Sequence, residues 1–403
     1  MTDIKNDIAL YIHWPFCERK CPYCDFNSHV SDTVDQAHWR DALLSELAHF
    51  AAETQGRRLT SVFFGGGTPS LMAPATVAAL LDAAADHWQA ATDLEVTLEA
   101  NPSSAEQGRF ADYRHAGVNR LSIGVQSLRD EPLAFLGRVH DAAQARAAMK
   151  VAKAVFERVS FDLIYARPHQ SVADWQVELG EVLAMSGDHL SVYQLTIEPG
   201  TAFFREGVAG ADEDRAVELF EATQEILEAA GFLAYEISNH ARPGAESRHN
   251  LTYWRGGDYV GIGPGAHGRI TPGAHGRITP GAHGRLASPT TFEATHQIHD
   301  PARWLELVGE HGHGTAKRRQ LSPTERAEEM IMAGLRLTEG LDTKALAALS
   351  GLSFDDLVEP GHLRELTAGG FLDAAAGRIT ATAEGRLRLN SILARLLAPE
   401  AGA

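Results

Sequence analysis

The chain has 403 residues, with 36 basic and 53 acidic side chains and a formal net charge of −17. This length corresponds to two or three domains at roughly 150 residues each. The 44% hydrophobic and 22% charged residues are ordinary for a globular protein and exclude a disordered chain. The acidic balance argues against nucleic acid or an anionic membrane as the main partner. The sequence has no apolar run of roughly 18 residues, and its polar start predicts no signal peptide, so we expect a cytoplasmic protein.

Short β-rich runs alternate with helical patterns over the first half of the chain. Apolar residues recur at three and four positions over Gln36–Ala52 and Ala75–Trp88, which predicts helices. Strands that alternate with helices indicate βαβ units and a parallel sheet. Six units over about 190 residues are too few for an eight-fold barrel, so we predict an open, partial (β/α)6 barrel over residues 1–210, with its site in the loops after the strands. The predicted strands are 8–13, 61–64, 94–100, 120–125, 159–165 and 189–195.

A mixed α+β extension is predicted over residues 211–320. A helix over Glu213–Ala230 leads to a strand over Phe232–Ile237 and then to a stretch rich in Gly, His and Arg. Within this stretch, the octapeptide Gly-Ala-His-Gly-Arg-Ile-Thr-Pro occurs at 265–272 and again at 273–280, and a third copy begins at 281.

The repeat predicts a local duplication that loops out at the surface, because repeated Gly and Pro disfavour helix and central strand. The alternative is an added metal or haem site made by the three histidines of the repeat, His267, His275 and His283. Even spacing follows automatically from duplication, so it does not favour this alternative.

The composition changes again over residues 321–403. Pro323 stands where a helix begins, and Glu325–Leu337 has helical periodicity. Further helical patterns at 343–349, 354–366 and 386–397 accompany a small hairpin at 371–382. This order predicts a winged-helix-like module, and its mixed charges favour packing or partner docking over the reading of DNA.

All three cysteines of the chain lie within eight residues, in Cys17-Glu-Arg-Lys-Cys21-Pro-Tyr-Cys24. An odd number at this spacing does not form a disulfide framework, so it points to metal or redox chemistry. Thiolates bind iron–sulfur clusters, and a four-iron cluster held by three cysteines keeps one iron open for an outside ligand. The alternatives are a zinc site that adds His13 or His29, or plain buried cysteines.

A glycine-rich loop, Gly65-Gly66-Gly67-Thr68-Pro69, follows the second predicted strand. Bare backbone there can approach a ligand closely and bind a zwitterion. Together with Tyr11-Ile-His-Trp-Pro-Phe-Cys-x3-Cys-x-Tyr-Cys, this loop makes the chain similar to the radical S-adenosylmethionine (radical SAM) superfamily. Nearly the whole chain resembles its branch of oxygen-independent coproporphyrinogen III oxidases and HemW haem chaperones. The resemblance implies that the three cysteines hold a [4Fe-4S] cluster whose fourth iron is chelated by S-adenosylmethionine.

The resemblance also implies contacts to S-adenosylmethionine at or just beyond the predicted strand ends. Two tyrosines would make aromatic contacts, the glycine loop would hold the amino group, and Asp162 would contact the ribose. Three further residues would make polar contacts, among which the fork of Arg138 suits a carboxylate. The residues so implied are Tyr11, Tyr23, Gly66, Gly67, Thr68, Glu99, Gln126, Arg138 and Asp162.

Two features select the branch. The oxidases carry a further cysteine two residues after the third, where this chain has Phe26. The chaperones carry His-Asn-x-x-Tyr-Trp, present here as His249-Asn250-Leu-Thr-Tyr253-Trp254. Imidazole is a common axial ligand of haem iron, and Tyr and Trp can pack on a porphyrin face. Without the resemblance, His249 is typical of a polar residue near a bend, and the two aromatic residues are typical of a core. The resemblance implies haem bound near this motif and a haem chaperone, with oxidative decarboxylation of coproporphyrinogen III, or another radical reaction, as alternatives.

The chaperone reading also carries expectations about partners. It implies that the chain binds haem and passes it to haem-accepting apoproteins, respiratory enzymes at the membrane among them. It also implies a cytoplasmic location that includes the inner membrane face. A homodimer is compatible with it. One segment departs from both branches, because Ala166-Arg167-Pro168 replaces the family's Gly-Leu-Pro. We therefore expect an added charge near the cofactor mouth, beside Asp162.

Overall fold

A single sheet organises the computed structural model, which describes residues 6–31, 33–271 and 292–398. It has 12 strands in the order β14-β13-β12-β11-β1-β4-β5-β6-β7-β8-β10-β9. The predicted α/β fold, a partial barrel with a mostly parallel sheet, is confirmed, and all six predicted strands are present. The parallel part consists of β1 (Asp7–Trp14), β4 (Arg58–Gly66), β5 (Gln89–Ala100), β6 (Arg120–Gln126), β7 (Arg158–Tyr165), β8 (His189–Gln194) and β11 (Asp258–Ile262).

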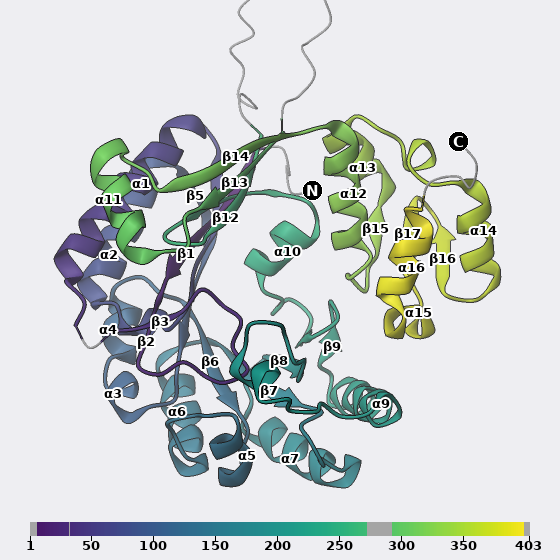
Figure 1. The fold of residues 1–403 in the computed structure, drawn as a ribbon, viewed down its shortest axis with the longest axis horizontal. Helices are drawn as coiled ribbons and strands as arrows, with labels where there is room; N and C mark the ends of the chain where they lie inside the picture. The colour runs from purple at the N-terminus through teal and green to yellow at the C-terminus, as the bar shows by residue number, and fades with distance from the viewer. Residues whose placement is uncertain (1–5, 32, 272–291, 399–403) are drawn as a thin grey trace, which may run out of the picture.

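Helices cover the outer face of the sheet (Figure 1). The central strand β1 is buried on both faces, so its sequence is nearly continuous in apolar residues rather than alternating. The helices predicted at 36–52, 75–88 and 213–230 are confirmed to within two residues. The outer helices are α1 (Gln36–Glu53), α2 (Pro74–His87), α3 (Ser104–Gln107), α4 (Phe110–His115), α5 (Asp130–Phe135), α6 (Ala142–Val155), α7 (Val172–Met185), α9 (Glu213–Ala229) and α11 (Pro301–His311). The short helix α8 (Ala202–Arg205) lies instead against the segment that holds the three cysteines, where Phe203 N–H donates to the Pro22 carbonyl (3.0 Å).

The sheet continues beyond residue 210, because the extension supplies strands to both of its edges. β11 pairs with β1 in parallel, and three antiparallel strands follow it outward. Two short antiparallel strands extend the opposite edge from β8. The strand predicted at 232–237 is reduced to two residues there. The added strands are β12 (His267–Ile270), β13 (Phe292–Gln297), β14 (Thr315–Leu321), β9 (Leu233–Ala234) and β10 (Asn239–Ala241).

The first copy of the repeat is not a loop, so the expectation for it was wrong. Gly261 belongs to β11 and Gly268 to β12, both inside the sheet. A Cβ at Gly261 would lie 2.0 Å from the carbonyl oxygen of His267, and one at Gly268 would lie 2.5 Å from the hydroxyl of Thr295. Glycine stands at these positions because neighbouring chain segments approach too closely for a side chain.

A smaller C-terminal module stands beside the barrel and has its own apolar core (Figure 1). Its elements follow the order predicted for a winged-helix-like unit, with the hairpin between the last helices. They are α12 (Pro323–Gly334), β15 (Leu341–Asp342), α13 (Thr343–Ser350), α14 (Pro360–Ala368), β16 (Leu372–Ala375), β17 (Arg378–Ala381), α15 (Ala383–Leu387) and α16 (Leu389–Leu396).

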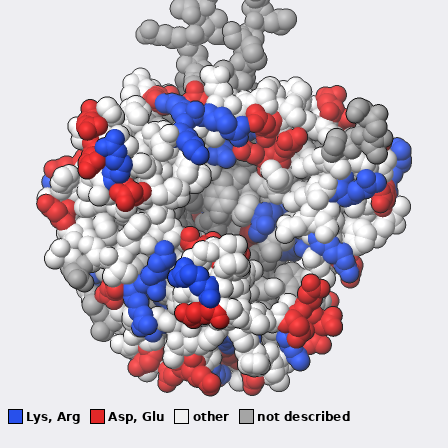
Figure 2. All heavy atoms as spheres, viewed as in Figure 1, with Lys and Arg blue, Asp and Glu red and all other residues white. Residues whose placement is uncertain are grey.

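Two surface properties complete the description. Basic and acidic side chains are intermingled over the face shown in Figure 2. Among the helices that the structure describes, none combines the length and the apolar character needed to cross a membrane.

The repeat can be shortened as a test. The second and third copies lie outside the described residues, but Thr271 before them donates hydrogen bonds to Asp258 at the start of β11, the opposite end of the parallel strands from the cysteines. Deleting residues 265–280 leaves one complete Gly-Ala-His-Gly-Arg unit to replace β12. We expect unchanged iron and haem content and a free energy of unfolding within about 1 kcal/mol, since loop closure changes by only about 0.6 kcal/mol per doubling.

Iron analysis, haem titration and urea unfolding check this prediction. Loss of iron or haem from a deletion variant that still folds would make the repeat histidines part of a site.

Candidate functional site

The cysteine loop follows β1 and is fixed to the extension. It begins in β2 (Phe16–Cys17), turns through a hydrogen bond from Cys24 N–H to the Cys21 carbonyl (3.1 Å), and ends at β3 (His29–Val30). Asn27 anchors it, because its Nδ2 donates to the carbonyls of Pro264 and His299, each at 2.9 Å. The strands from the extension therefore position the loop at the C-terminal ends of the barrel strands, where such barrels place their sites.

Each cysteine thiol lies against a polar side chain and is partly exposed. Thr68 Oγ1 donates to Cys17 Sγ and Arg138 Nη1 donates to Cys21 Sγ, both at 3.4 Å. A Cβ at Gly67 would lie 3.0 Å from Cys17 Sγ, so glycine keeps the space beside the sulfur free. Burial raises the pKa of the Cys17 thiol to about 11, which a bound cationic metal group would reverse.

The thiols fit a cluster better than a single ion. Among the described residues, no three His, Cys, Asp or Glu side chains are placed to hold one metal ion. Three thiolates on one zinc ion must converge, since each Zn–S bond is about 2.3 Å, whereas each thiolate of a cubane cluster binds a different iron. The two histidines of the zinc alternative are also engaged, because His13 and His29 both hydrogen-bond to Asn27 through Nε2.

A cavity of about 350 Å³ opens beside the three thiols; we call it the cofactor cavity. It is lined by side chains and backbone from β4, β5, β6 and β7 and from the loops that follow them, which is where we expected the site. Of the residues implied for S-adenosylmethionine, only Tyr11 does not line it and lies deeper in the barrel. The residues brought together are Cys17, Cys21, Cys24, Tyr23, Gly66, Gly67, Thr68, Glu99, Gln126, Arg138 and Asp162.

Two buried carboxyl groups give this cavity its electrostatic character. Burial, and then the charge of Asp162, raises the pKa of Glu99 to about 8. Burial raises the pKa of Asp162 to about 6, against the effect of its hydrogen bond from Ser122 (3.1 Å). Both carboxyls would ionise more readily beside a positive charge, so the cavity suits a cationic ligand such as a sulfonium.

Arg138 is held by backbone and amide oxygens on the other side of the cavity. Its Nη2 donates to the Gly124 carbonyl (2.8 Å) and to Asn101 Oδ1, and Asn101 Nδ2 donates to Thr68 Oγ1 (3.0 Å). Gln126 has a positive φ of 66°, and its buried Oε1 has no partner among the described residues. Asn101 was missed as a site residue, although it follows a predicted strand end like the others.

The expectation for Arg167 is wrong. Its Nη2 donates to the buried carboxylate of Glu178 on α7 at 2.6 Å, which directs the side chain away from the cofactor cavity. The same carboxylate accepts from Ser127 Oγ and from Leu128 N–H (2.7 Å). Arg167 therefore ties two outer loops to α7 and adds no charge beside Asp162.

A second cavity of about 310 Å³, the inner chamber, continues into the barrel and shares Glu99, Asp162 and Tyr193 with the cofactor cavity. It is lined by the whole second motif, which stands on α10 (Arg248–Trp254) inside the ring of outer helices (Figure 1). The two motifs, 225 residues apart in the chain, thus face adjacent cavities that share three lining residues. The predicted residues on the chamber are Tyr11, His249, Asn250, Tyr253 and Trp254.

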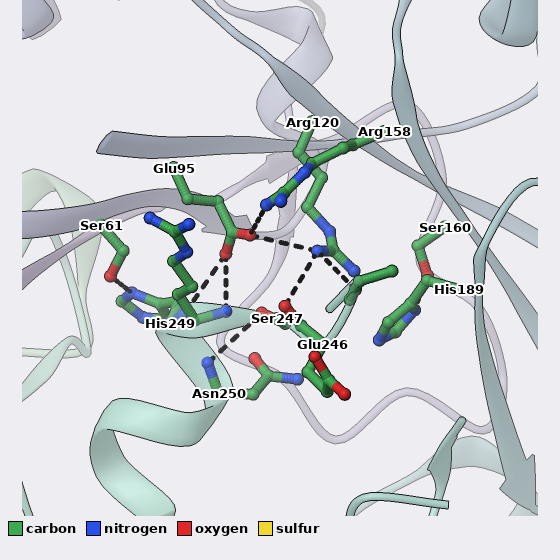
Figure 3. Close-up of polar contacts among 12 residues, drawn as sticks. Ser61, Glu95, Arg120, Arg158, Ser160, His189, Glu246, Ser247, His249 and Asn250 are labelled. Carbon is green, nitrogen blue, oxygen red and sulfur yellow. Dashed lines mark hydrogen bonds and ion pairs between the residues drawn. The ribbon is translucent and has the colours of Figure 1, made fainter. Parts of the chain in front are cut away.

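One buried carboxylate, Glu95, fixes the start of α10 (Figure 3). It accepts hydrogen bonds from the N–H groups of Arg248 (2.8 Å) and His249 (3.4 Å), and the Ser247 hydroxyl caps the same helix end. The other oxygen of Glu95 accepts from Arg120 (3.1 Å) and from a second arginine on β7. A carboxylate at a helix N-terminus is favourable because the first N–H groups have no partner within the helix.

His249 stands in the first turn of this helix, and one of its two ring nitrogens is hydrogen-bonded. Its Nδ1 is hydrogen-bonded to the Ser61 hydroxyl (3.1 Å), and its ring stacks on Phe63 with centroids 5.0 Å apart. Among the described hydrogen bonds, none involves Nε2. Only 4% of the residue is exposed, and burial lowers the pKa of the imidazole to about 3, so the ring is neutral at pH 7.

The chain matches known proteins at both ends. The model of the radical SAM superfamily matches residues 11–179, and that of the HemN C-terminal domain matches residues 321–388. The structure titled coproporphyrinogen III oxidase (HemN) from Escherichia coli, a radical SAM enzyme, covers 98% of this chain and 91% of its own, with a TM-score of 0.79 and 22% identity, so the two share a fold. The chain is a radical SAM protein, and this class implies a [4Fe-4S] cluster and S-adenosylmethionine.

Two longer matches define the family more narrowly. Heme chaperone HemW of Escherichia coli is 39% identical over 393 residues, covering 97% of this chain and 98% of that protein. Radical S-adenosyl methionine domain-containing protein 1, mitochondrial, of Bos taurus is 45% identical over 338 residues, covering 83% of this chain and 74% of that protein. The chain belongs to the HemW family, which confirms the family resemblance of its motifs.

The cysteine assignment predicts a loss of cluster in single variants. Replacing Cys17, Cys21 or Cys24 by Ala removes a ligand that no other cysteine can replace, so each variant should lose the visible thiolate-to-iron absorption. Anaerobic reconstitution with iron and sulfide analysis measures this. Ser28→Ala is the matched control, because Ser28 contacts Cys24 Sγ (3.7 Å) without being a thiolate, and it should keep its cluster. Four irons retained by any Cys variant would contradict the assignment.

The Glu95 network predicts a large effect on stability. Glu95→Gln leaves Arg120 buried beside an uncharged amide, so the free energy of unfolding should fall by about 3–5 kcal/mol. Arg158→Gln removes a partner of the same carboxylate whose side chain is one-third exposed, and it should cost less than about 1 kcal/mol. Urea unfolding followed by circular dichroism compares the two. Equal losses of unfolding free energy in the two variants would show that the buried Glu95–Arg120 pair does not contribute more to stability than the partly exposed one.

Proposed function

We propose that the chain is a haem chaperone that carries a [4Fe-4S] cluster on its three cysteines and S-adenosylmethionine in the cofactor cavity. Three observations support the cofactor assignment: the donors directed at the sulfurs, the space kept by Gly67 and the two carboxyls that suit a sulfonium. When bound, such a cluster can supply an electron to S-adenosylmethionine. The chain's own residues bind and orient the cofactor, Arg138 by the charge of its guanidinium and Asp162 by its carboxyl group.

Haem is the proposed cargo, and His249 is the proposed iron ligand. The observation that carries this proposal is the ring geometry: when Nδ1–H donates to the Ser61 hydroxyl, Nε2 keeps the free lone pair that haem iron requires. The relative named heme chaperone HemW, similar over almost its full length, supports the cargo. Because Phe63 and α10 bury the ring, ligation there requires α10 to move away from the barrel strands.

The runner-up function is oxidative decarboxylation of coproporphyrinogen III. The shared fold with the solved oxidase favours it, but that similarity is at 22% identity and supports the architecture alone. The position of the oxidases' further cysteine is occupied by Phe26, which is 62% exposed at the rim of the cofactor cavity. Haem-accepting apoproteins, respiratory enzymes among them, are the proposed receivers of haem, in the cytoplasm and at the inner membrane face.

A haemin titration of variants tests the haem proposal. His249→Ala should weaken haemin binding at least about tenfold, or about 1.4 kcal/mol, or change the Soret band, while cluster absorption remains. His189→Asn is the matched control, because His189 lines the same chamber but both of its ring nitrogens are hydrogen-bonded, to Ser160 (2.7 Å) and Tyr235 (2.9 Å). Unchanged spectra and affinity in His249→Ala would exclude His249 as the ligand.

A second arm separates the two functions. The anaerobically reconstituted wild-type protein is incubated with coproporphyrinogen III, a reductant and S-adenosylmethionine. The chaperone proposal expects no protoporphyrinogen above a blank without protein. Sustained formation of protoporphyrinogen would contradict the chaperone function and support the oxidase function.

A further inference from the structure

Two histidines meet on the surface, away from the cofactor cavity and the inner chamber. His296 is the last residue but one of β13, and His299 follows in the turn before α11. The Nε2 atoms of the two rings are 2.9 Å apart, and the ring planes are nearly perpendicular, at 89°. His299 is exposed and His296 is partly exposed, so an ion in solution can reach both side chains.

The separation of the two nitrogens matches that of two ligands on one metal ion. An ion at about 2.0–2.1 Å from each imidazole nitrogen, with a right angle between the two bonds, places the nitrogens about 2.9 Å apart. A tetrahedral angle would place them about 3.3–3.4 Å apart. Tetragonal coordination by nitrogen and oxygen, with right angles between neighbouring ligands, is typical of Ni²⁺ and Cu²⁺. The pair therefore fits such an ion without a change of conformation.

The protons of the two rings do not block an ion. In the chain without a metal this contact is an N–H···N hydrogen bond, so one ring carries its proton on Nε2. None of the described hydrogen bonds involves Nδ1 of His296 or His299, so that atom can carry the proton instead and leave both Nε2 lone pairs free. Burial, and then His299 and Lys317, lower the pKa of His296, which favours the neutral ring that a metal requires.

The backbone that carries the pair is fixed. Asn27 Nδ2 donates to the carbonyl of His299 at 2.9 Å, and Ile298 is held through both its N–H and its carbonyl by backbone hydrogen bonds of 2.9 Å. The ring of His267, on β12, stacks on the ring of His296 with centroids 4.1 Å apart and an angle of 19°. Ligands that are already ordered lose less conformational freedom on binding.

The charges around the pair tolerate a cation. Burial lowers the pKa of His267 to about 4, so the ring stacked on His296 is neutral at pH 7. Lys317 stands opposite His296 on β14, but its side chain is exposed, so solvent and salt screen its charge. Asp300 follows His299 directly and carries the opposite charge.

We propose that His296 and His299 bind one divalent transition-metal ion, Ni²⁺ or Cu²⁺, through their Nε2 atoms, with water at its remaining positions. The site uses two side chains, in keeping with the part of the chain that the structure describes, where no three such side chains are placed around one ion. It is separate from the cysteines and depends neither on S-adenosylmethionine nor on haem.

Calorimetric titration of the full-length, cluster-loaded chain with Ni²⁺ tests the proposal. The wild type should bind Ni²⁺ saturably, and His299→Asn should weaken that binding at least about tenfold, since even outer partners of metal ligands contribute this much. His38→Asn is the matched control, because His38 is exposed on α1 and its ring has no partner among the described residues. It should bind like the wild type, because the other histidines of the chain give the same background in every variant.

His296→Asn provides an independent variant of the same site. It should lose as much affinity as His299→Asn, and the double variant should lose no more, because one missing ligand already removes the chelate. Circular dichroism and iron content should stay unchanged in all variants. Zn²⁺, which prefers tetrahedral sites, should bind more weakly than Ni²⁺. The proposal is overturned by an absence of saturable Ni²⁺ binding to the wild type, by undiminished binding in either variant, by an equal loss in His38→Asn, or by tighter binding of Zn²⁺.

Discussion

The position of the second motif depends on one buried carboxylate, Glu95. Its oxygens bind two guanidiniums and the first N–H groups of α10, although the side chain has no exposure to solvent. A buried carboxylate of this kind is stabilised by the charges and donors that are paired with it. The requirement fixes α10 inside the barrel rather than on its surface, which places His249 and Trp254 on the inner chamber.

The C-terminal module completes this arrangement from outside. Arg326 donates to the Gly256 carbonyl just after α10, and Arg255 pairs with Glu339 at 2.7 Å. Arg336, from the same module, stacks on Trp254 and lines the chamber. The module therefore contributes one side chain, Arg336, to a chamber that is otherwise lined by the barrel strands and by residues 236–254. These contacts hold the module against α10 and the residues that follow it.

The sequence predicted those features of the structure that depend on residues close together in the chain, and it missed those that depend on a residue on another element. The strand β1 is apolar on both faces, so it was readable as a short run. Glu99 and Gln126 at strand ends and Asp162 within β7 line one cavity, as the predicted order of strands led us to expect. The direction of Arg167 depends on Glu178, a residue on another element, and no local pattern shows it. The strand β12 was missed for a related reason: its Gly268 is required by the close approach of Thr295 on β13, while in the sequence alone a glycine indicates a loop.

The burial of His249 sets a thermodynamic condition on haem exchange. Opening α10 leaves the Glu95–Arg120 ion pair intact, because both residues stand on barrel strands, but it breaks the two hydrogen bonds from α10 N–H groups to the buried Glu95 carboxylate. At about 1.5–3 kcal/mol for each hydrogen bond to a charged group, the opening costs about 3–6 kcal/mol. An open state at that free energy is populated at roughly one part in 10² to 10⁴, and the apparent affinity for haem at His249 falls by the same factor. A haem held there would be bound well only when another interaction stabilises the open state. An acceptor protein or a ligand that prefers one position of α10 would then control both uptake and release, which is the behaviour that delivery of haem requires.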